Sequence, residues 1–280
     1  MITNLIYFLY NIKIEYIRKS KDSYIFFYDN SFYIFKQCYI TEDYLLGLYN
    51  YINDKDGLYH SIIKSRYNKL ISNYNNNSYI LMKVKVNSNR LLLLEDIYSN
   101  KNVSYIKKNS LNWSYLWKLK VDQVEYIVNN NNNFSIIVLS IINYYIGIAD
   151  IAINIFENIN NSLIPLTLCH KRIYSNCDLY EYYGVTNLII DHVTRDMGEY
   201  IKSDIYNNKK IDLSKYGIIK NISLEDKYLL LSRILFPSYF FDIFDDFILN
   251  NKDFIDFNKY FIDIDVYEKN LIKTIKFILK

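Results

Sequence analysis

The chain has few cysteines, glycines and prolines. It holds 3 cysteines, 6 glycines and 2 prolines in 280 residues. Cys38, Cys169 and Cys177 are odd in number and have no CxxC spacing, which argues against a disulfide framework and against a zinc site. We therefore expect a reducing compartment, and the cytoplasm is the default location.

An excess of charge of one sign is also missing. Lys and Arg number 33 and Asp and Glu number 30, which gives a net charge of +3. This surplus is too small to indicate a nucleic-acid surface, so no nucleic-acid partner is expected. Hydrophobic residues make up 51% and charged residues 22%, the balance of a globular protein. The length is sufficient for two lobes, each with its own core.

Tyrosine is abundant, with 31 copies. An AT-rich genome accounts for this bias. The rival interpretation is a tyrosine-rich, cross-linked structural protein, which usually needs repeats or low complexity. No internal repeat is visible, and the tyrosines are spread through ordinary amphipathic patterns.

The N-terminus does not have the pattern of a signal peptide, because MITNLIYFLYNIKIEY has no basic n-region and no small-residue cleavage site. One apolar run, residues 134–156, is long enough to cross a membrane. Asn143, Asp150 and Asn154 interrupt this run, and an Asp inside lipid is costly. We interpret the run as the central helix of a large lobe and expect no membrane span.

Residues 1–86 predict an N-lobe of mixed α/β structure with an antiparallel sheet. Residues 23–35 hold two β-rich runs around Asp29-Asn30, and residues 71–86 hold two more around Asn75–Asn77. Both patterns indicate hairpins. Residues 41–52 predict a helix capped by Thr41, which residues 54–57 break.

Residues 87–110 are expected to form a hinge or linker, and residues 111–280 a mostly helical C-lobe. Amphipathic patterns in the C-lobe predict four helices, at residues 111–128, 134–156, 224–236 and 266–279. Trp113 and Trp117 share one helix face and are expected in the core.

Residues 166–202 carry the strongest functional signal. An apolar run ends at His170, a loop and a hairpin-like segment follow, and a second apolar run, residues 185–190, ends on Asp191. A kinase-type active site has this order, with a catalytic-loop His at one strand end and a metal-binding Asp at the next. The residue two positions after the His should be the catalytic Asp, and here it is Arg172.

Three ordered blocks resemble the spore coat CotS/YutH-like family, which is similar to aminoglycoside and choline phosphotransferases. The blocks are LCHKRI from Leu168, LIIDHVTRDMGEYIK from Leu188 and LLLSRILFPSYFFDIF from Leu229. The resemblance covers much of the chain from about Trp113 onward. It implies an α+β, protein-kinase-like bilobal fold with a small β-rich N-lobe and a larger, mostly helical C-lobe. It also implies a role in sporulation.

The resemblance places His170 at the catalytic-loop His position, where it would support the loop backbone. Arg172 stands at the catalytic-base position, and an arginine cannot accept a proton near neutral pH. Cys177 falls where the loop Asn would be, and Asn176 is one residue away. The loop is therefore expected to be vestigial, with no intact catalytic residue.

Lys36, in YIFKQ, is the candidate for the lysine that holds the nucleotide phosphates, with Glu42 as its candidate acidic partner. Asp191 sits at the metal-Asp position and is the predicted cofactor and metal ligand. Asp196 sits where such kinases often place a structural Asp. No glycine-rich loop occurs in residues 23–35. ATP and magnesium would be the cofactors of an intact site of this kind.

Each of these residues also has a simpler interpretation. His170 would be a core histidine, Asp191 would cap the following helix, and Lys36 would be a half-buried strand lysine. His60 has no evident partner in the sequence and is expected at the surface.

Two functions of different classes follow. The first is a catalytically impaired kinase-like protein that acts as a binding or scaffold module in sporulation. Its partner would be a spore coat or other protein, and Lys171 and Arg172 would attract a small anionic ligand. The resemblance places it in the mother cell or the spore coat.

The alternative is an active ATP-dependent small-molecule phosphotransferase acting on a hydroxyl, with Asp191 or Asp178 in place of the missing base. A third interpretation is a structural coat component assembled through tyrosines. We rank the impaired kinase first, the active phosphotransferase second and the structural polymer third.

Overall fold

The computed structural model describes most of the chain. The described residues are 2–20, 22–53, 58–86, 88, 90–99, 104–107, 113–131, 134–159, 163–249 and 264–280. They form two compact units. Unit 1 holds Met1–Leu92, Leu168–Arg172 and Asn176–Ile190, and unit 2 holds Leu93–Thr167, Ile173–Ser175 and Asp191–Lys280. The predicted helix break at residues 54–57 lies outside the described residues.

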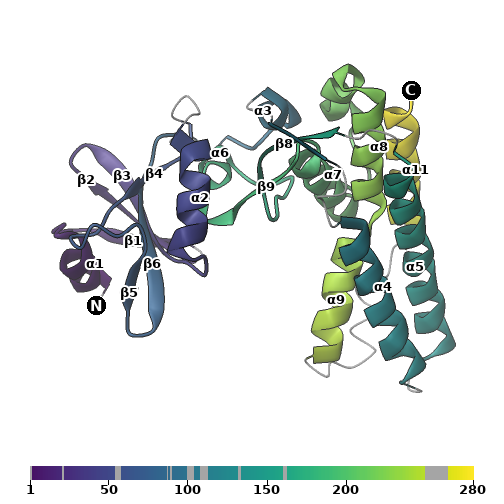
Figure 1. Cartoon of the computed structure of the whole chain (residues 1–280), viewed down its shortest axis with the longest axis horizontal. Coiled ribbons are helices and arrows are strands. Elements are labelled where there is room, and N and C mark those ends of the chain that lie inside the picture. Colours follow the sequence, from purple (N-terminus) through teal and green to yellow (C-terminus); the bar gives the residue numbers. More distant parts are fainter. Residues whose placement is uncertain are drawn as a thin grey trace. The chain divides into compact units, whose positions relative to one another are not determined.

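Unit 1 is built on an antiparallel sheet with the order β1-β2-β3-β6-β4, and β5 also pairs with β6 (Figure 1). The strands are β1 (Ile17–Ser20), β2 (Ser23–Tyr28), β3 (Ser31–Gln37), β4 (Ser61–Ile63), β5 (Ser72–Tyr74) and β6 (Asn77–Lys83). The helices are α1 (Ile2–Tyr10), α2 (Glu42–Asn53) and α6 (Leu179–Tyr182), with the 3-10 turn η2 (Val185–Asn187).

One face of this sheet packs against α1. Leu5, Ile6 and Leu9 of α1 form a core cluster with Tyr33 and Phe35 of β3. Because side chains alternate across a strand, Ile34 and Lys36 of β3 point to the opposite face. Lys36 is therefore on the face away from α1.

Both predicted hairpins are confirmed. Asp29 and Asn30 connect β2 to β3 with φ of 45° and 55°, and Asn75 and Asn76 connect β5 to β6 with φ of 48° and 62°. Two consecutive residues of positive φ are typical of the type I′ turn, which Asn and Asp tolerate. The predicted helix cap is confirmed too, since the Thr41 hydroxyl accepts from the Tyr44 backbone N–H at 3.2 Å.

Unit 2 is mostly helical, and its helices form a bundle (Figure 1). They are α3 (Leu94–Ser99), α4 (Trp113–Asn129), α5 (Ile136–Glu157), α7 (Arg195–Asn207), η3 (Leu213–Asn221), α8 (Leu224–Leu235), α9 (Ser238–Leu249) and α11 (Ile264–Ile278). A second sheet, whose strands β8 and β9 are divided between the two units, has the order β7-β8-β9, with β7 (Ser104–Lys107), β8 (Leu163–His170) and β9 (Leu188–His192). Trp117 stacks on Phe236 at 4.5 Å between ring centroids, so the tryptophan helix face is part of the core as predicted.

Helix α5 is the apolar run that composition alone could assign to a membrane. It is the one described helix with enough length and hydropathy for a span. Its buried face includes Ile142, Ala149 and Ala152, and α5 packs against α4 and α8. The exposed positions repeat every three or four residues. Ser140, Asn143, Gly147, Asp150, Asn154 and Glu157 form a largely polar stripe among them, and Ile136, Ile137 and Ile151 are exposed as well. The Asp and Glu of this stripe would be costly in lipid, and a stripe of this kind is compatible with the core helix of a folded lobe.

Two sequence predictions about local structure in unit 1 are wrong. His60 is fully buried rather than at the surface, with its Nε2 3.0 Å from the Tyr180 carbonyl oxygen. The segment after His170 is not hairpin-like, because it forms α6 and η2. Asp178 caps α6 by accepting from the Glu181 backbone N–H at 2.7 Å. A short helix with its own cap replaces the expected strand pair.

Candidate functional site

Two adjoining cavities in unit 1 surround Lys36. The larger has a volume of about 780 Å³ and the smaller about 160 Å³. They share five lining residues: Asp22, Lys36, Glu181, Gly184 and Thr186. Small-molecule sites commonly occupy about 300–1,000 Å³, so the larger cavity has the size of a ligand site.

Lys36 lines both cavities from β3, on the sheet face away from α1, whereas Ile2, Phe35 and Tyr79 of the α1 side line the larger cavity alone. The strand pairs Lys36 with Ile80 of β6 and with Ser23 of β2, which fixes its position. The side chain is half-buried, as the simpler interpretation expected. No carboxylate of the described residues forms an ion pair with it.

Glu42 is not the partner of Lys36. Its Oε1 accepts from the Leu70 backbone N–H at 2.8 Å, and its Oε2 lies 3.5 Å from Lys69 Nζ. The sequence expectation for Glu42 is therefore wrong, because its carboxylate binds Lys69 and the backbone of Leu70, which are distant in sequence.

Cys38 follows Lys36 on the wall of the larger cavity. Burial raises the pKa of its thiol to about 11, with a smaller opposing effect of the Lys36 charge. The thiol is therefore protonated at neutral pH and is a poor nucleophile. Cys38 serves as an apolar part of the wall.

The segment predicted as the catalytic loop is held to the rest of unit 1 by hydrogen bonds to backbone groups. His170 is buried, and its Nε2 lies 2.7 Å from the Tyr182 carbonyl oxygen. Lys171 donates its backbone N–H to Asn187, and the Asn187 side chain donates to the Arg172 carbonyl oxygen at 2.7 Å. Lys171 lines the larger cavity and also lies over the Tyr44 ring at 5.7 Å.

Cys177, which the resemblance places where the loop Asn would be, is buried. Its carbonyl oxygen accepts from the Leu92 backbone N–H at 2.8 Å, and its thiol donates to the Asp178 carbonyl oxygen. A thiol is a weak hydrogen-bonding group and provides no amide oxygen for a magnesium ion.

Tyr180 lines the smaller cavity and was not predicted as a site residue. Its hydroxyl is buried and has no hydrogen-bond partner among the described residues. Burial raises the pKa of this phenol, and the nearby Asp178 carboxylate raises it further. No sequence pattern distinguishes it from the other tyrosines, since only the fold places it beside Lys36.

Asp191 belongs to unit 2, where both of its carboxylate oxygens have partners. Oδ1 accepts from the His192 backbone N–H at 2.7 Å. Oδ2 accepts from Arg195 and lies 3.6 Å from Arg233 Nη2. Asp191 is therefore not the cap of α7, whose N-cap residue is Thr194. A metal ion at this carboxylate would have to compete with two guanidinium groups.

Arg233 connects Asp191 to a second buried carboxylate. Its Nη1 lies 3.5 Å from Glu199 Oε1, and that same oxygen lies 2.7 Å from Lys202 Nζ. Lys202 also donates to the Ser238 hydroxyl at 2.8 Å. All of these charged groups are at most 5% exposed. Among the described residues, no three His, Cys, Asp or Glu side chains gather as a metal-ligand cluster.

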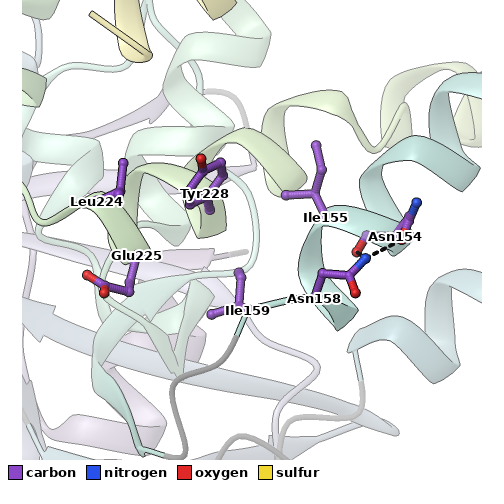
Figure 2. A pocket seen from close by; sticks show the side chains of 7 residues that line it. All are labelled: Asn154, Ile155, Asn158, Ile159, Leu224, Glu225 and Tyr228. Atoms are coloured by element: carbon purple, nitrogen blue, oxygen red, sulfur yellow. Dashed lines mark hydrogen bonds between the residues drawn. The ribbon is translucent and has the colours of Figure 1, made fainter.

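Unit 2 has a cavity of its own, of about 430 Å³, between the end of α5 and the start of α8 (Figure 2). Its lining residues are Asn154, Ile155, Asn158, Ile159, Leu224, Glu225 and Tyr228. None of the residues predicted from the kinase pattern lines it. The cavities around Lys36 are therefore the candidate site.

Comparison with known proteins identifies the family. Residues 3–255 match the family described as "Spore coat putative kinase YutH". The chain belongs to this family. The endospore coat-associated protein YutH of Bacillus subtilis (strain 168) is 24% identical over 162 residues, which are 50% of this chain and 47% of that protein. The match thus spans about half the length of this curated relative, and it confirms the predicted YutH resemblance.

Solved structures confirm the predicted α+β, kinase-like fold. An aminoglycoside phosphotransferase from Alicyclobacillus acidocaldarius has a TM-score of 0.62 at 11% identity, with 94% of this chain and 92% of that chain covered. The AMP-bound spectinomycin phosphotransferase has a TM-score of 0.58 at 15% identity, with 96% of each chain covered. At these identities the likeness establishes the fold alone.

Proposed function

We propose that this YutH-family protein is a catalytically impaired phosphotransferase that acts as a binding or scaffold module of the spore coat. The observation that supports this most is Arg172 at the catalytic-base position. A guanidinium remains protonated throughout the physiological range and cannot accept the proton of an attacking hydroxyl.

The surroundings of Asp191 support the same proposal. The family pattern assigns this carboxylate to magnesium, but its oxygens are engaged by His192, Arg195 and Arg233. Magnesium requires oxygen ligands in near-ideal octahedral geometry. The residues present therefore fit this metal poorly, and the metal role of Asp191 stays a prediction.

The proposed location and partner depend on the family. The curated relative is named an endospore coat-associated protein. We extend this to the chain as a proposal: it acts at the spore coat or in the mother-cell cytoplasm, with a coat protein as its partner. A kinase fold without a catalytic base still offers ligand and protein binding surfaces.

Turnover measurements test this function. The purified chain, with ATP and magnesium, should transfer no phosphate to a panel of sugar and amino-alcohol hydroxyls and should hydrolyse no ATP above the protein-free rate. Arg172→Asp should not restore transfer by itself, because Asp191 remains paired with two arginines. Transfer by the natural chain that is lost in Asp191→Asn would refute the proposal.

One observation favours an active phosphotransferase as the second candidate. Asp178 and Glu181 line the smaller cavity together with Lys36, so carboxylates are present near the predicted phosphate lysine. Under this alternative, one of them takes the role of the base. Asp178→Asn or Glu181→Gln would then abolish turnover, whereas Asp22→Asn, on the same cavity wall, would retain it.

A further inference from the structure

Helix α11 carries a row of lysines on its exposed side. Lys269, Lys273 and Lys276 are four and three residues apart, so they lie along one side of the helix, and all three are exposed. The opposite side of α11 is buried in unit 2. Residues 269–280 hold four lysines and no acidic residue, so nothing in this stretch balances the row.

Two neighbouring segments of unit 2 extend this positive surface. Lys220 of η3 lies over the Phe277 ring of α11, with its Nζ 5.7 Å from the ring centre. The Asn270 side chain donates to the Asn208 carbonyl oxygen at 2.9 Å, which brings the exposed lysine pair at 209–210 next to α11. We define the basic surface as Lys209, Lys210, Lys220, Lys269, Lys273 and Lys276.

Positive charge is concentrated in the two segments that form this surface. Residues 208–221 and 264–280 hold eight lysines and three acidic residues, a net charge of +5, whereas the whole chain has +3. Of the three acids, Asp212 caps η3, and Asp265 and Glu268 lie towards the start of α11. Helix α3 also packs on η3 and adds two acidic residues on that side. The surplus is therefore greatest along α11 from Lys269 onward.

The fold does not use the lysines of the basic surface for ion pairs. None of them is paired with a carboxylate of a described residue, whereas Lys118 pairs with Glu157 and Lys120 with Asp245. Like charges three and four residues apart on a helix repel each other, and the helix dipole offsets this only in the last turn. The row thus costs the isolated chain some stability, and an anionic partner would remove that cost.

Exposed apolar side chains beside the row indicate the class of partner. Ile272 and Leu279 are 42% and 50% exposed and lie seven residues apart on one flank of it. Residues 208–221 and 264–280 contain no arginine, and their aromatic rings are buried or half-buried, so the groups that usually stack on nucleic-acid bases are missing. The apolar side of α11 is buried in unit 2, so it is not free to enter a bilayer. An acidic polypeptide offers both carboxylates and apolar side chains.

We propose that the basic surface docks an acidic segment of a partner protein. This inference deepens the proposed function, on which it rests, because it gives the chemistry of the partner that the binding module would take. Carboxylates would pair with the lysine row, and apolar side chains would cover Ile272 and Leu279, which are about 10 Å apart along the helix axis. Every third residue of an extended chain is also about 10 Å apart, so a Glu-Glu-Leu repeat matches this spacing.

Fluorescence anisotropy of a labelled peptide with four Glu-Glu-Leu repeats, titrated with the full chain, tests the inference. The peptide should bind, and added salt should weaken the binding. The α11 variant, which combines Lys269→Gln, Lys273→Gln and Lys276→Gln, should bind the peptide about tenfold more weakly or worse. Ile272→Ser together with Leu279→Ser should weaken binding about threefold through lost apolar contact.

Three exposed lysines of unit 1 provide the matched control. The variant that combines Lys13→Gln, Lys64→Gln and Lys85→Gln removes the same charge from the chain and should bind the peptide as the natural chain does. Neither triple variant should lower the melting temperature, because no ion pair between described residues is lost. A lower melting temperature in the α11 variant alone would show that the row serves the fold, and it would overturn the inference.

Four binding results would also overturn it. They are no binding of the Glu-Glu-Leu peptide at millimolar concentration, equal losses in the α11 and control variants, equal binding of a Glu-Glu-Ser repeat, and tighter binding of a short DNA duplex or of phosphatidylglycerol vesicles than of the peptide. The turnover assay is a separate readout. Phosphate transfer would refute the proposed catalytic impairment and leave the docking surface standing, whereas a chain that neither transfers phosphate nor binds the peptide would lose this inference alone.

Discussion

The guanidinium carbon of Arg233 lies 3.5 Å from the centre of the Trp113 ring. This cation–π contact joins α8 to α4 at the place where Arg233 also meets Asp191 and Glu199. Arg233 therefore neutralises two buried carboxylates while its flat face covers an aromatic ring. A guanidinium combines these tasks better than an ammonium, because it is planar and less strongly hydrated.

Removing the charge of Arg233 should destabilise the protein strongly. In Arg233→Met, Asp191 would keep only the positive charge of Arg195, and Glu199 only that of Lys202. Each buried carboxylate would therefore be neutralised less well. We expect a loss of about 3–5 kcal/mol in the free energy of unfolding, measured by urea denaturation. Arg233→Lys keeps the positive charge and should therefore lose less of the free energy of unfolding. Similar losses in the two variants would contradict the electrostatic explanation.

Gly198 is required by the close approach of Arg233. A Cβ at this position would lie 2.8 Å from Arg233 Cγ and 3.0 Å from its Cδ. Because contacts on both sides hold Arg233, we expect Gly198→Ala to destabilise by about 1–3 kcal/mol, despite the higher helix propensity of Ala.

Gly147→Ala is the control for this prediction. Gly147 is on the exposed stripe of α5, and a Cβ added there would meet no other atom within 4 Å. This variant should stabilise the protein by about 0.5–1 kcal/mol. Thermal unfolding of both variants checks the pair, and a gain in stability for Gly198→Ala would sink the packing argument.

His60 should make stability fall in mild acid. Burial lowers its pKa from 6.5 to about 4, and the charge of Lys85 contributes less. The neutral ring fits its site, since Nδ1 accepts from the Lys85 backbone N–H and Nε2 faces the Tyr180 carbonyl oxygen. The unfolded chain binds a proton below about pH 6.5 and the folded chain only near pH 4. The contribution of neutral His60 to the free energy of unfolding is therefore fully present above pH 6.5 and is lost as the pH falls towards 4.

The free energy of unfolding that His60 removes in acid follows from the difference between its pKa values in the folded and unfolded chain. The loss amounts to about 3 kcal/mol when the pH has fallen to 4. Unfolding free energies measured from pH 7 to pH 4.5 should fall less steeply for His60→Gln, which cannot titrate. Identical slopes for the variant and the natural chain would show that His60 is not responsible.

The polar stripe of α5 predicts opposite tolerances on its two faces. Asp150→Lys, on the exposed face, should change stability by less than about 0.5 kcal/mol. Ala152→Leu, at a position that is 0% exposed, should cost about 1–3 kcal/mol through overpacking. Urea denaturation measures both. The reverse order would mean that α5 does not pack as a core helix.

Patterns in the amino-acid sequence were enough to define several of the local elements and their order, although not the helix α6 after His170. Paired Asn and Asp residues at 29–30 and 75–76 set both hairpin turns, because they tolerate positive φ. The helical spacing of apolar residues set α4, α5, α8 and α11, and the ordered blocks around His170 and Asp191 indicated the kinase-like plan. These signals are short-range, so they can be recognised without knowing the fold.

Which charged and polar groups meet depends instead on how the chain folds in three dimensions. Glu42 pairs with Lys69 instead of Lys36, His60 is buried beside Tyr180, and Asp191 is shared between Arg195 and Arg233. Such partners are chosen by the packing of segments far apart along the chain, and a buried charge accepts whichever opposite charge the fold brings within reach. The sequence named the candidate residues, whereas the packing determined that Lys36 faces a cavity and that Asp191 is already paired.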